Sequence, residues 1–525
     1  MQIGLKYYKR IDMIKLKYLA IVTVLTSLIL SACTMVRPID TNQDEKPATP
    51  TSSIPVTESS LSTNIFDSIF PGQPIPDEVA TQLLYDLASD DIAKISIATE
   101  AILTARDQRF VSVLIELLRF SQIGLTDSDF ALGHILNRLS GESFGANWAS
   151  WIEWYGSTDL TPPPGFTTWK GSVLARIDPG FGEFLQDDFA STARVEEIQW
   201  GGVHVDGIPA LDQSAMIDSV QAGYLTPDEP VFGLEINGDA RAYPLRILDW
   251  HEMANDIVGG VPVSIAYCTL CGAAVAYNGL ASDGVVYDFG SSGFLFRSNK
   301  LMYDRQTRTL WNQLTGEPVL GELVGTGVKL EILPIVLTTW ASWLEQHPDT
   351  QVLDRNTGFN RPYDVGSAYG DYFSATETMF PVWQRNDLLE TKEQVYAMQI
   401  DGIPVAYPIA TLDQEQVVND SVGETNLVVV ALNGPVSVEG QSRRIGPVTY
   451  IAGSEVRAYN RGDHTFTTGP SIDVLMDERG RQWQVTEAAL IGPDGEEVMR
   501  LGGHLAYWFG WFAFFPDTLV YGESE

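Results

Sequence analysis

The stretch that decides the fold runs from Val231 to Gly272 and reads VFGLEINGDARAYPLRILDWHEMANDIVGGVPVSIAYCTLCG. When Val231 is placed on Val395, the stretch aligns without gaps with VYAMQIDGIPVAYPIATLDQEQVVNDSVG, Val395 to Gly423. Both stretches carry Tyr-Pro, Leu-Asp and Asn-Asp at matching positions. Further on, the segments Trp340–Trp343 and Trp508–Trp511 match at a slightly larger offset. Self-similarity at a nearly fixed offset indicates a duplicated unit.

The two copies differ at the residues that could carry out chemistry. The first copy contains His251 and the only Cys-x-x-Cys of the chain, formed by Cys268 and Cys271. The second copy has Glu415 opposite the histidine and no cysteine. Residues that both copies keep are expected to serve the fold. We therefore select Cys268, Cys271 and His251, which only the first copy has, as the candidate site.

Local patterns predict the elements of each copy. Asn237-Gly238 between two apolar runs is a strong signal for a β-hairpin. Residues Leu248–Val258 have helical spacing, with Asp249 placed to cap the helix. The apolar run Val261–Tyr267 then predicts a strand that ends at the first cysteine. We expect two β-rich α+β units, packed together as a pseudo-symmetric pair.

Length and charge limit the class of protein. A chain of 525 residues is too long for a single core, so several domains are expected. The net charge is −35, from 68 acidic and 33 basic residues. A nucleic-acid-binding protein would show the opposite balance, so we expect no nucleic-acid partner.

The N-terminus predicts export and lipid anchoring. Five basic residues between Lys6 and Lys17 precede an apolar run, Tyr18–Leu30, which at about 13 residues is too short to span a bilayer as a helix. The run ends in Leu-Ser-Ala-Cys33, which resembles a bacterial lipobox. This resemblance implies cleavage before Cys33 and lipidation of that cysteine. We expect a protein anchored by lipid to the extracytoplasmic face of a bacterial membrane.

A helical region precedes the duplicated stretch. Between Pro76 and Tyr155 the apolar residues recur at helical spacing, for example at Phe110, Leu114 and Leu118. The short amphipathic helices that this predicts resemble HEAT-like repeats, which bind protein partners. The sequence TPPPG at 161–165 cannot continue a helix and is expected to end this domain.

The predicted fold class is a multidomain chain, with an α-helical, HEAT-like N-terminal domain followed by a duplicated β-rich α+β domain. The boundaries follow from the changes in pattern and composition. We expect a signal peptide with lipobox at 1–33, a disordered tether at 34–63, a helical domain at 64–160, a connector at 161–197, a first repeat unit with Cys-x-x-Cys at 198–353, a linker at 354–385 and a degenerate second unit at 386–525.

Two long motifs carry a family resemblance. WHEMANDIVGGVPVSIAYCTLCGAAVAY and, after it, SGFLFRSNKLMYDRQTRTLWNQLTGEPV resemble the domain-of-unknown-function family 3179. The resemblance covers residues 198–522, about three fifths of the chain. It implies a bacterial or archaeal envelope protein with this duplicated domain, and it implies no activity. Thr269 stands where the family typically has proline inside the Cys-x-x-Cys.

The cysteine pair predicts a metal site in the first instance. Cys-x-x-Cys followed by glycine resembles a metal knuckle, in which a tight turn places both sulfurs on one side. Cys33 is expected to carry lipid, so a site with four cysteines is excluded. A single Zn or Cu ion would bind Cys268, Cys271 and His251, with one further ligand or an open position. Candidates for the further ligand are His204, Asp304 and Met302.

Other interpretations of the same residues stay open at this point. An exported Cys-x-x-Cys can cycle between dithiol and disulfide, and a protonated histidine beside it would lower a thiol pKa. The pair could also be an inert structural disulfide. A further alternative is a non-catalytic envelope scaffold, in which the helical domain binds a protein and the duplicated unit binds a ligand. No catalytic residue is assigned.

Overall fold

The computed structural model describes residues 65–126 and 132–523. The expected signal peptide, the lipobox with Cys33 and the tether lie outside these residues. Within the described part of the chain, no helix has both the length and the apolar character needed to cross a membrane.

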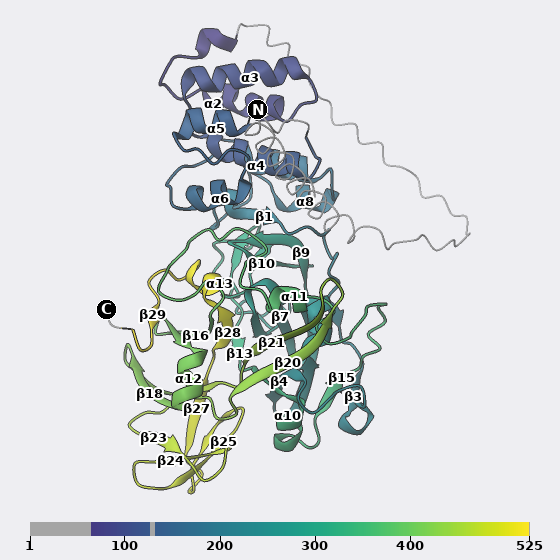
Figure 1. The fold of residues 1–525 in the computed structure, drawn as a ribbon, viewed down its shortest axis with the longest axis vertical. Helices are drawn as coiled ribbons and strands as arrows, with labels where there is room; N and C mark the ends of the chain where they lie inside the picture. The colour runs from purple at the N-terminus through teal and green to yellow at the C-terminus, as the bar shows by residue number, and fades with distance from the viewer. Residues whose placement is uncertain (1–64, 127–131, 524–525) are drawn as a thin grey trace, which may run out of the picture. The chain divides into compact units, whose positions relative to one another are not determined.

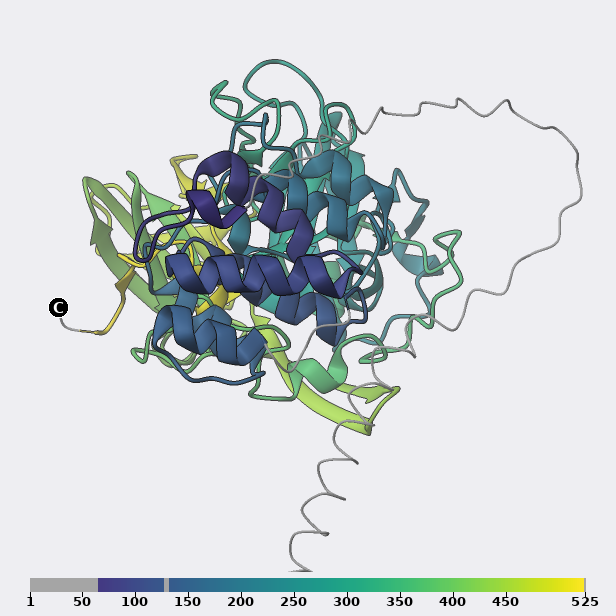
Figure 2. The same ribbon diagram turned by 90° about the horizontal axis from the view of Figure 1, so that it is seen from above.

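Residues 77–184 form a helical part, and a strand-rich part follows it (Figure 1). Its helices are α2 (Asp77–Leu87), α3 (Ile92–Ala105), α4 (Phe110–Gln122), α5 (Leu132–Ser140), α6 (Trp148–Gly156), α7 (Phe166–Leu174) and α8 (Pro179–Phe184). The predicted apolar face of α4 is confirmed, because Phe110, Leu114 and Leu118 are fully buried. Helices α7 and α8 follow TPPPG and extend the helical part into residues expected to form a connector. Figure 2 shows these helices from above, over the strands.

A buried ion pair joins the helical part to the chain that enters the first sheet. Lys170 of α7 lies 2.5 Å from the carboxylate of Glu116 of α4. Its ammonium also donates to the carbonyls of Val195, at 3.1 Å, and Ile198, at 2.5 Å. Lys170 is fully buried and Glu116 nearly so, so both charges depend on these partners.

The strand-rich part contains two series of elements in the same order. The first series is β4 (Pro230–Ile236), β5 (Asp239–Pro244), α9 (Leu245–His251), β6 (Met253–Val258), β7 (Val261–Cys268) and β8 (Ala273–Asn278). The second series is β16 (Gln394–Ile400), β17 (Ile403–Pro408), α12 (Ile409–Glu415), β18 (Val417–Val422), β19 (Thr425–Val430) and β22 (Arg457–Asn460). From β4 to β6, every element begins and ends at the same offset from its counterpart, the offset that places Val231 on Val395.

The later elements also correspond, at the larger offset that places Trp340 on Trp508. The first series continues with β14 (Val336–Thr339), α10 (Trp340–Gln346) and β15 (Gln351–Leu353), and the second with β28 (His504–Tyr507), α13 (Trp508–Phe512) and β29 (Leu519–Val520). Strand β14 is antiparallel to β4, and β15 is parallel to β5. In the same way, β28 is antiparallel to β16, and β29 is parallel to β17.

The predicted hairpin turns are confirmed in both series. Asn237 and Gly238 join β4 to β5 with φ of 53° and 80°, and Asp401 and Gly402 join β16 to β17 with φ of 51° and 78°. Positive φ at both turn residues matches the twist of the flanking strands, which explains the choice of Asn-Gly and Asp-Gly.

The predicted helix from Leu248 to Val258 is wrong. The helix ends at His251, and the next residue, Glu252, has φ of 55° and donates its N–H to the carbonyl of Leu248. Residues 253–258 form β6, paired along its whole length with β7. Backbone pairing with a distant strand thus outweighs a short run of helical spacing. Asp249 therefore lies inside α9 and does not cap a helix.

The other strands complete the sheets. One sheet has the order β1 (Ile198–Trp200), β9 (Phe289–Phe296), β10 (Asn299–Asp304), β11 (Leu310–Asn312) and β12 (Pro318–Leu320). A second consists of β13 (Ile332–Leu333), β8, β7, β6 and β2 (Leu211–Asp212), and a third of β14, β4, β5, β15 and β3 (Met216–Asp218). In the second series, β28, β16, β17 and β29 form one sheet, and β18, β19 and β22 continue into β27 (Glu497–Leu501), β26 (Ala489–Ile491), β25 (Gln482–Val485), β24 (Val474–Asp477) and β23 (Phe466–Thr468).

One connection differs strongly between the two series. Residue Ala266 of β7 pairs with Val275 of β8, and the equivalent Val430 of β19 pairs with Arg457 of β22. The connection is the short cysteine turn in the first series, whereas the second has a long hairpin of β20 (Pro435–Ser442) and β21 (Gly446–Ser454). This hairpin lies across the first series, beside β4 and α11 (Gly370–Phe373) (Figure 1).

Residues that recur in both series make the same contacts. A tyrosine hydroxyl donates to an aspartate, an asparagine amide donates to a strand carbonyl, and a tryptophan N–H donates to a threonine hydroxyl. These pairs are Tyr243–Asp256 and Tyr407–Asp420, Asn255–Phe289 and Asn419–Phe466, and Trp343–Thr350 and Trp511–Thr518. The prediction that shared residues serve the fold is confirmed for these pairs.

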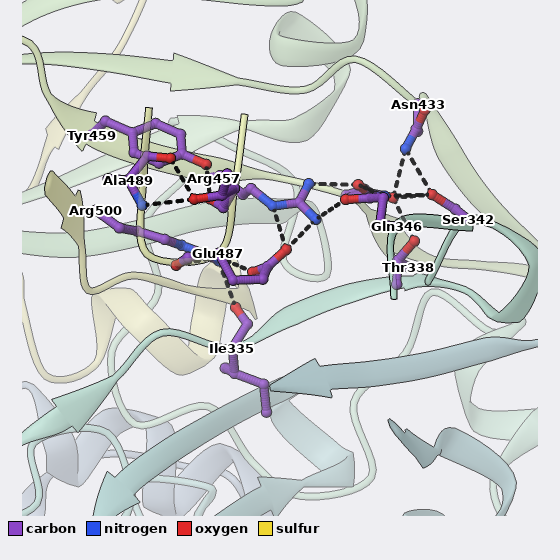
Figure 3. Close-up of polar contacts among 12 residues, drawn as sticks. Ile335, Thr338, Ser342, Gln346, Asn433, Arg457, Tyr459, Glu487, Ala489 and Arg500 are labelled. Atoms are coloured by element: carbon purple, nitrogen blue, oxygen red, sulfur yellow. Dashed lines mark hydrogen bonds and ion pairs between the residues drawn. The ribbon is translucent and has the colours of Figure 1, made fainter. Parts of the chain in front are cut away.

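A buried ion network joins the two series (Figure 3). The guanidinium of Arg457 lies 2.5 Å from the carboxylate of Glu455 and 2.5 Å from that of Glu487. Arg500 pairs with Glu487 and also donates to the carbonyl of Ile335 in the first series, at 3.2 Å. Because these charges are buried, each needs its partner in place.

Candidate functional site

The two cysteines lie on one tight turn between β7 and β8. Cys268 ends β7, and Cys271 ends the turn η4 (Thr269–Cys271), after which Gly272 has φ of 61°. The thiols are not bonded to each other, and 1% of Cys268 and none of Cys271 is exposed. The backbone N–H of Lys300 donates to the sulfur of Cys268, and the Cys271 thiol donates to the carbonyl of Ser298, each at 3.4 Å.

A buried lysine and a buried glutamate lie beside the first sulfur. The Lys300 ammonium is 3.5 Å from the Glu252 carboxylate and donates to the Glu252 carbonyl at 3.0 Å. The other carboxylate oxygen of Glu252 accepts from the hydroxyl of Thr269, inside the Cys-x-x-Cys, at 2.9 Å. Burial lowers the pKa of Lys300, and Glu252 and Cys268 act against this shift. Lys300 is therefore anchored beside Cys268 by its backbone N–H and by the pairing of its side chain with Glu252.

The second series forms one wall of the cysteine turn. A side chain added at Gly272 would lie 3.2 Å from the ring of Tyr507, at the end of β28. A side chain added at Gly510 of α13 would lie 3.1 Å from the Cβ of Cys271. Both glycines thus permit a close approach of the two series. Burial raises the pKa of the Cys271 thiol well above its ordinary value, and the neighbouring Cys268 adds to the shift.

The segment that connects the two series, residues 354–393, forms a second wall. The hydroxyl of Tyr372 donates to the carbonyl of Leu270, between the two cysteines, at 2.6 Å. The ammonium of Lys392 lies 3.8 Å from the centre of the Tyr372 ring and donates to the Tyr372 carbonyl at 2.6 Å. The hydroxyl of Ser298 donates to the carbonyl of Pro381 at 2.5 Å. The cysteine turn is therefore enclosed by parts of the chain far from it in sequence.

A buried carboxyl group, that of Asp249, lies in α9 shortly before Glu252. Asp249 is 3% exposed, and its Oδ1 is sealed from solvent without a hydrogen-bond partner. Burial raises the pKa of Asp249 well above its ordinary value, and Glu252 adds to the shift. After burial itself, Asp249 is the main cause of the raised pKa of Tyr267, Tyr450 and Tyr507.

The structure directs His251 away from the cysteines. Its Nδ1 lies 2.8 Å from the carbonyl of Pro209, and its Nε2 lies 2.5 Å from the hydroxyl of Tyr363. Burial lowers the pKa of His251 to about 4, so the ring is neutral at pH 7. The equivalent residue of the second series, Glu415, also bonds to a tyrosine hydroxyl, that of Tyr521, at 3.0 Å. In both series, the last residue of the helix therefore links it to a later segment through a tyrosine hydroxyl.

The expected set of metal ligands is not gathered in this structure. Among residues 65–126 and 132–523, the group of three or more His, Cys, Asp or Glu with ligand atoms within 4.8 Å of one another is His464, Asp477 and Glu478, which includes neither cysteine. The three further candidates are not grouped with both sulfurs and His251. His204 is exposed beside Asp178, Asp304 accepts from the indole of Trp311 at 2.9 Å, and Met302 is buried in the core around the cysteines.

Several residues of the site were missed by sequence reasoning. Glu252 had a usable signal, because the equivalent residue of the second copy is Gln416. Lys300 lies in the second long motif, yet its position against the cysteines depends on the pairing of β10 with β9. Tyr507 comes from the second series and has no local pattern that connects it to the cysteine turn.

Comparison with known proteins gives a family and no activity. No protein of curated function and no solved structure matches the chain. The model of the family described as "Protein of unknown function (DUF3179)" matches residues 205–518. This range includes the cysteine turn, the connecting segment and nearly all of both series, which is more than half of the chain. The chain therefore belongs to the DUF3179 family.

Proposed function

We propose that this chain is a lipid-anchored envelope protein whose Cys268–Cys271 pair is a redox-active dithiol. One observation carries the proposal: two unpaired thiols share a buried turn, with the Lys300–Glu252 ion pair beside the first sulfur. Compartments outside the cytoplasm are oxidising, and a Cys-x-x-Cys pair there can form and break a disulfide. The lipobox that ends at Cys33 supports anchoring and export.

Ligand number and charge favour a redox role over a metal site. A Zn²⁺ ion takes four ligands in structural sites and three protein ligands in catalytic ones, and the described residues place no His, Asp or Glu with both sulfurs. A Cu⁺ ion on two thiolates would add a net negative charge to a buried site where Lys300 is already paired. Disulfide formation instead removes two protons together with two electrons, so the charge of the site stays the same.

The test uses the full chain with Cys33→Ser, purified in detergent, whose remaining thiols are Cys268 and Cys271. The protein is equilibrated in buffers with different ratios of reduced to oxidised dithiothreitol, and its free thiols are counted. We expect a reversible transition of two thiols with one midpoint potential, which is lost in Cys268→Ser and in Cys271→Ser. The metal content of the same samples is measured by elemental analysis.

Two results would overturn this proposal. A pair that stays fully reduced or fully oxidised across the whole range would be inert. About one equivalent of Zn or Cu, absent from Cys268→Ser, would support the metal site that the sequence predicts instead. Neither result is expected from two buried thiols next to a paired lysine.

The wider architecture is part of the same proposal. We interpret the two series as a duplicated unit, supported by matching elements at two nearly equal offsets. We interpret the helical part as HEAT-like and as the surface for a protein partner, because consecutive helices such as α2 and α3, or α4 and α5, pack in pairs. In this view only the first unit carries the dithiol, and the second unit encloses it.

A further inference from the structure

A cavity of about 680 Å³ lies between the two series, and its lining includes no residue of the cysteine turn. The first series lines it with the ends of β4 and β5, with α10 and with residues 347–350. The second series lines it with residues that flank the β20–β21 hairpin in sequence and with the segments 471–473 and 484–487. A cavity of this size can hold a small molecule, and both series are needed to build it.

Side-chain hydrogen bonds between the series hold the walls of the cavity together (Figure 3). The amide of Asn433 donates to the hydroxyl of Ser342 at 3.0 Å and to the carboxylate of Glu455 at 2.7 Å. The guanidinium of Arg457 donates to the amide oxygen of Gln346 at 3.2 Å. Ser342 and Gln346 belong to the first series, and their partners belong to the second. The cavity is therefore built before a ligand enters, which lowers the cost of binding.

Carboxylates dominate the charge of the cavity. Its lining contains one Lys or Arg, which is Arg457, and this guanidinium is already paired with Glu455 and Glu487. The other carboxylates of the lining are those of Glu235, Glu345, Asp349 and Asp473. Six carboxylates thus face one basic side chain here, whereas the whole chain has 68 acidic and 33 basic residues. The acidic excess is stronger in the cavity than in the chain as a whole.

Three of these carboxylates have no partner of their own. Within residues 65–126 and 132–523, no ion pair and no side-chain hydrogen bond involves the carboxylate of Glu235, Glu345 or Asp349. A concave surface that carries one sign of charge concentrates its field and attracts ions of the opposite sign. The cavity therefore favours a cationic ligand.

The distribution of the carboxylates does not suit a metal ion. A metal ion gathers its ligand atoms around one point, at about 2–2.6 Å. In the described part of the chain, the group of three or more His, Cys, Asp or Glu with ligand atoms within 4.8 Å of one another includes no residue of the cavity. The unpaired carboxylates come instead from β4, from α10 and from the segment after α10. A fitting ligand carries positive charges that are separated from one another.

We propose that this cavity binds a small linear polyamine, whose ammonium groups pair with the carboxylates of Glu235, Glu345 and Asp349. A polyamine combines separated ammonium groups with short methylene chains, and each group donates several hydrogen bonds. This inference goes beyond the proposed redox role and does not depend on it.

Other residues of the lining match the remaining parts of such a ligand. The ring of His347 packs 4.0 Å from that of Trp343, and burial lowers the pKa of His347, so the ring is neutral at pH 7 and can accept a hydrogen bond from an ammonium group. Ile472 lines the same cavity and is 54% exposed, so it offers an apolar contact to the methylene groups.

Isothermal titration calorimetry with spermidine tests the proposal on the full chain with Cys33→Ser, in a non-ionic detergent. One triple variant removes the unpaired carboxylates of the cavity: Glu235→Gln, Glu345→Gln and Asp349→Asn. The matched control removes three exposed carboxylates outside the cavity: Asp90→Asn, Glu322→Gln and Glu439→Gln. Both variants lose the same amount of negative charge. A separate variant, Ile472→Lys, places a tethered ammonium group in the cavity.

We expect one spermidine to bind per parent chain. The site variant should bind it about tenfold more weakly or worse, because each exposed ion pair contributes a factor of about two to five. Ile472→Lys should weaken binding to a similar extent, because its ammonium competes for the same carboxylates. The control should differ from the parent chain by less than about twofold. Urea unfolding should have the same midpoint in all variants, because the replaced carboxylates have no partners to lose.

The possible results separate a built site from general attraction to an acidic protein. Equal losses in the site variant and the control, or several equivalents of spermidine per chain, would mean that spermidine follows the overall negative charge, and the site would be refuted. No binding to the parent chain at millimolar spermidine would refute it as well. If Mg²⁺ binds at the same place as tightly as spermidine does, the assignment to a polyamine is wrong. The dithiol titration is a separate measurement, so its failure would leave this inference standing.

Discussion

Replacement of Arg457 by methionine should destabilise the contact between the two series. The variant removes the guanidinium from Glu455 and Glu487, which are both buried. Loss of one partner from a buried pair typically costs about 3–5 kcal/mol. Glu487 keeps Arg500, and Glu455 keeps the hydroxyl of Thr338. We therefore expect the lower end, about 3 kcal/mol, at neutral pH.

The pKa of Glu455 indicates how strongly its surroundings together, with Arg457 the first of its partners, stabilise the charged carboxylate. Burial would raise this pKa, but Arg457 and the Thr338 hydroxyl outweigh burial and lower it from 4.5 to about 2. A difference of about 2.5 pH units corresponds to about 3 kcal/mol. A carboxyl with a lowered folded pKa contributes stability above its unfolded pKa, and this contribution is lost as the pH falls toward the folded value. The window for Glu455 is therefore about pH 4.5 to 2.

Urea unfolding followed by tryptophan fluorescence measures the effect. The parent chain should exceed Arg457→Met by about 3 kcal/mol at pH 7, and the difference should shrink by more than about 1 kcal/mol at pH 3. The control is Lys329→Met, which breaks an exposed pair with Glu317 and should cost less than about 1 kcal/mol. Equal midpoints for Arg457→Met and its parent, or a difference that is independent of pH, would refute the argument.

Three further variants test other parts of the structure. Gly272→Ala should cost about 1–2 kcal/mol in urea unfolding, because φ is 61° and the ring of Tyr507 is close; no loss would contradict the close packing. Tyr363→Phe leaves Nε2 of His251 without its partner and should lower the free energy of unfolding by about 1–3 kcal/mol. The midpoint potential of the dithiol should not change; a changed potential would show that His251 acts on the cysteines. Lys170→Met should cost about 3–5 kcal/mol in thermal or urea unfolding, and a neutral result would mean that its buried pair is not required.

The sequence predicts much of the fold because its decisive signals are local. Asn237-Gly238 and Asp401-Gly402 determine the hairpins through backbone conformation alone. The fixed offset between the two stretches predicts corresponding elements without knowledge of their contacts. The helix expected at 248–258 fails for the opposite reason, since residues 253–258 gain their backbone partners from β7.

The candidate site is only partly predictable. The cysteine pair stands out as a motif, and its absence from the second series marks it as a special feature of the first. The same reasoning singled out His251, whose role as a ligand stays a prediction; in the structure His251 and the equivalent Glu415 each bond to a tyrosine hydroxyl. Lys300 and Tyr507 reach the cysteines through tertiary packing, for which the sequence alone holds no local signal.

The long hairpin β20–β21 stands in the second series where the first has its cysteine turn. It packs against β4 of the first series and against α11, in the connecting segment that encloses the cysteine turn. The ring of Phe373 in α11 packs 5.1 Å from that of Tyr450 in β21. Replacement of residues 435–454 by a short turn should therefore loosen α11, whose Tyr372 donates to the carbonyl of Leu270 in the cysteine turn, and so open the dithiol. The rate at which 4,4′-dithiodipyridine modifies the two thiols should rise in this variant; an unchanged rate would show that the hairpin does not help to enclose them.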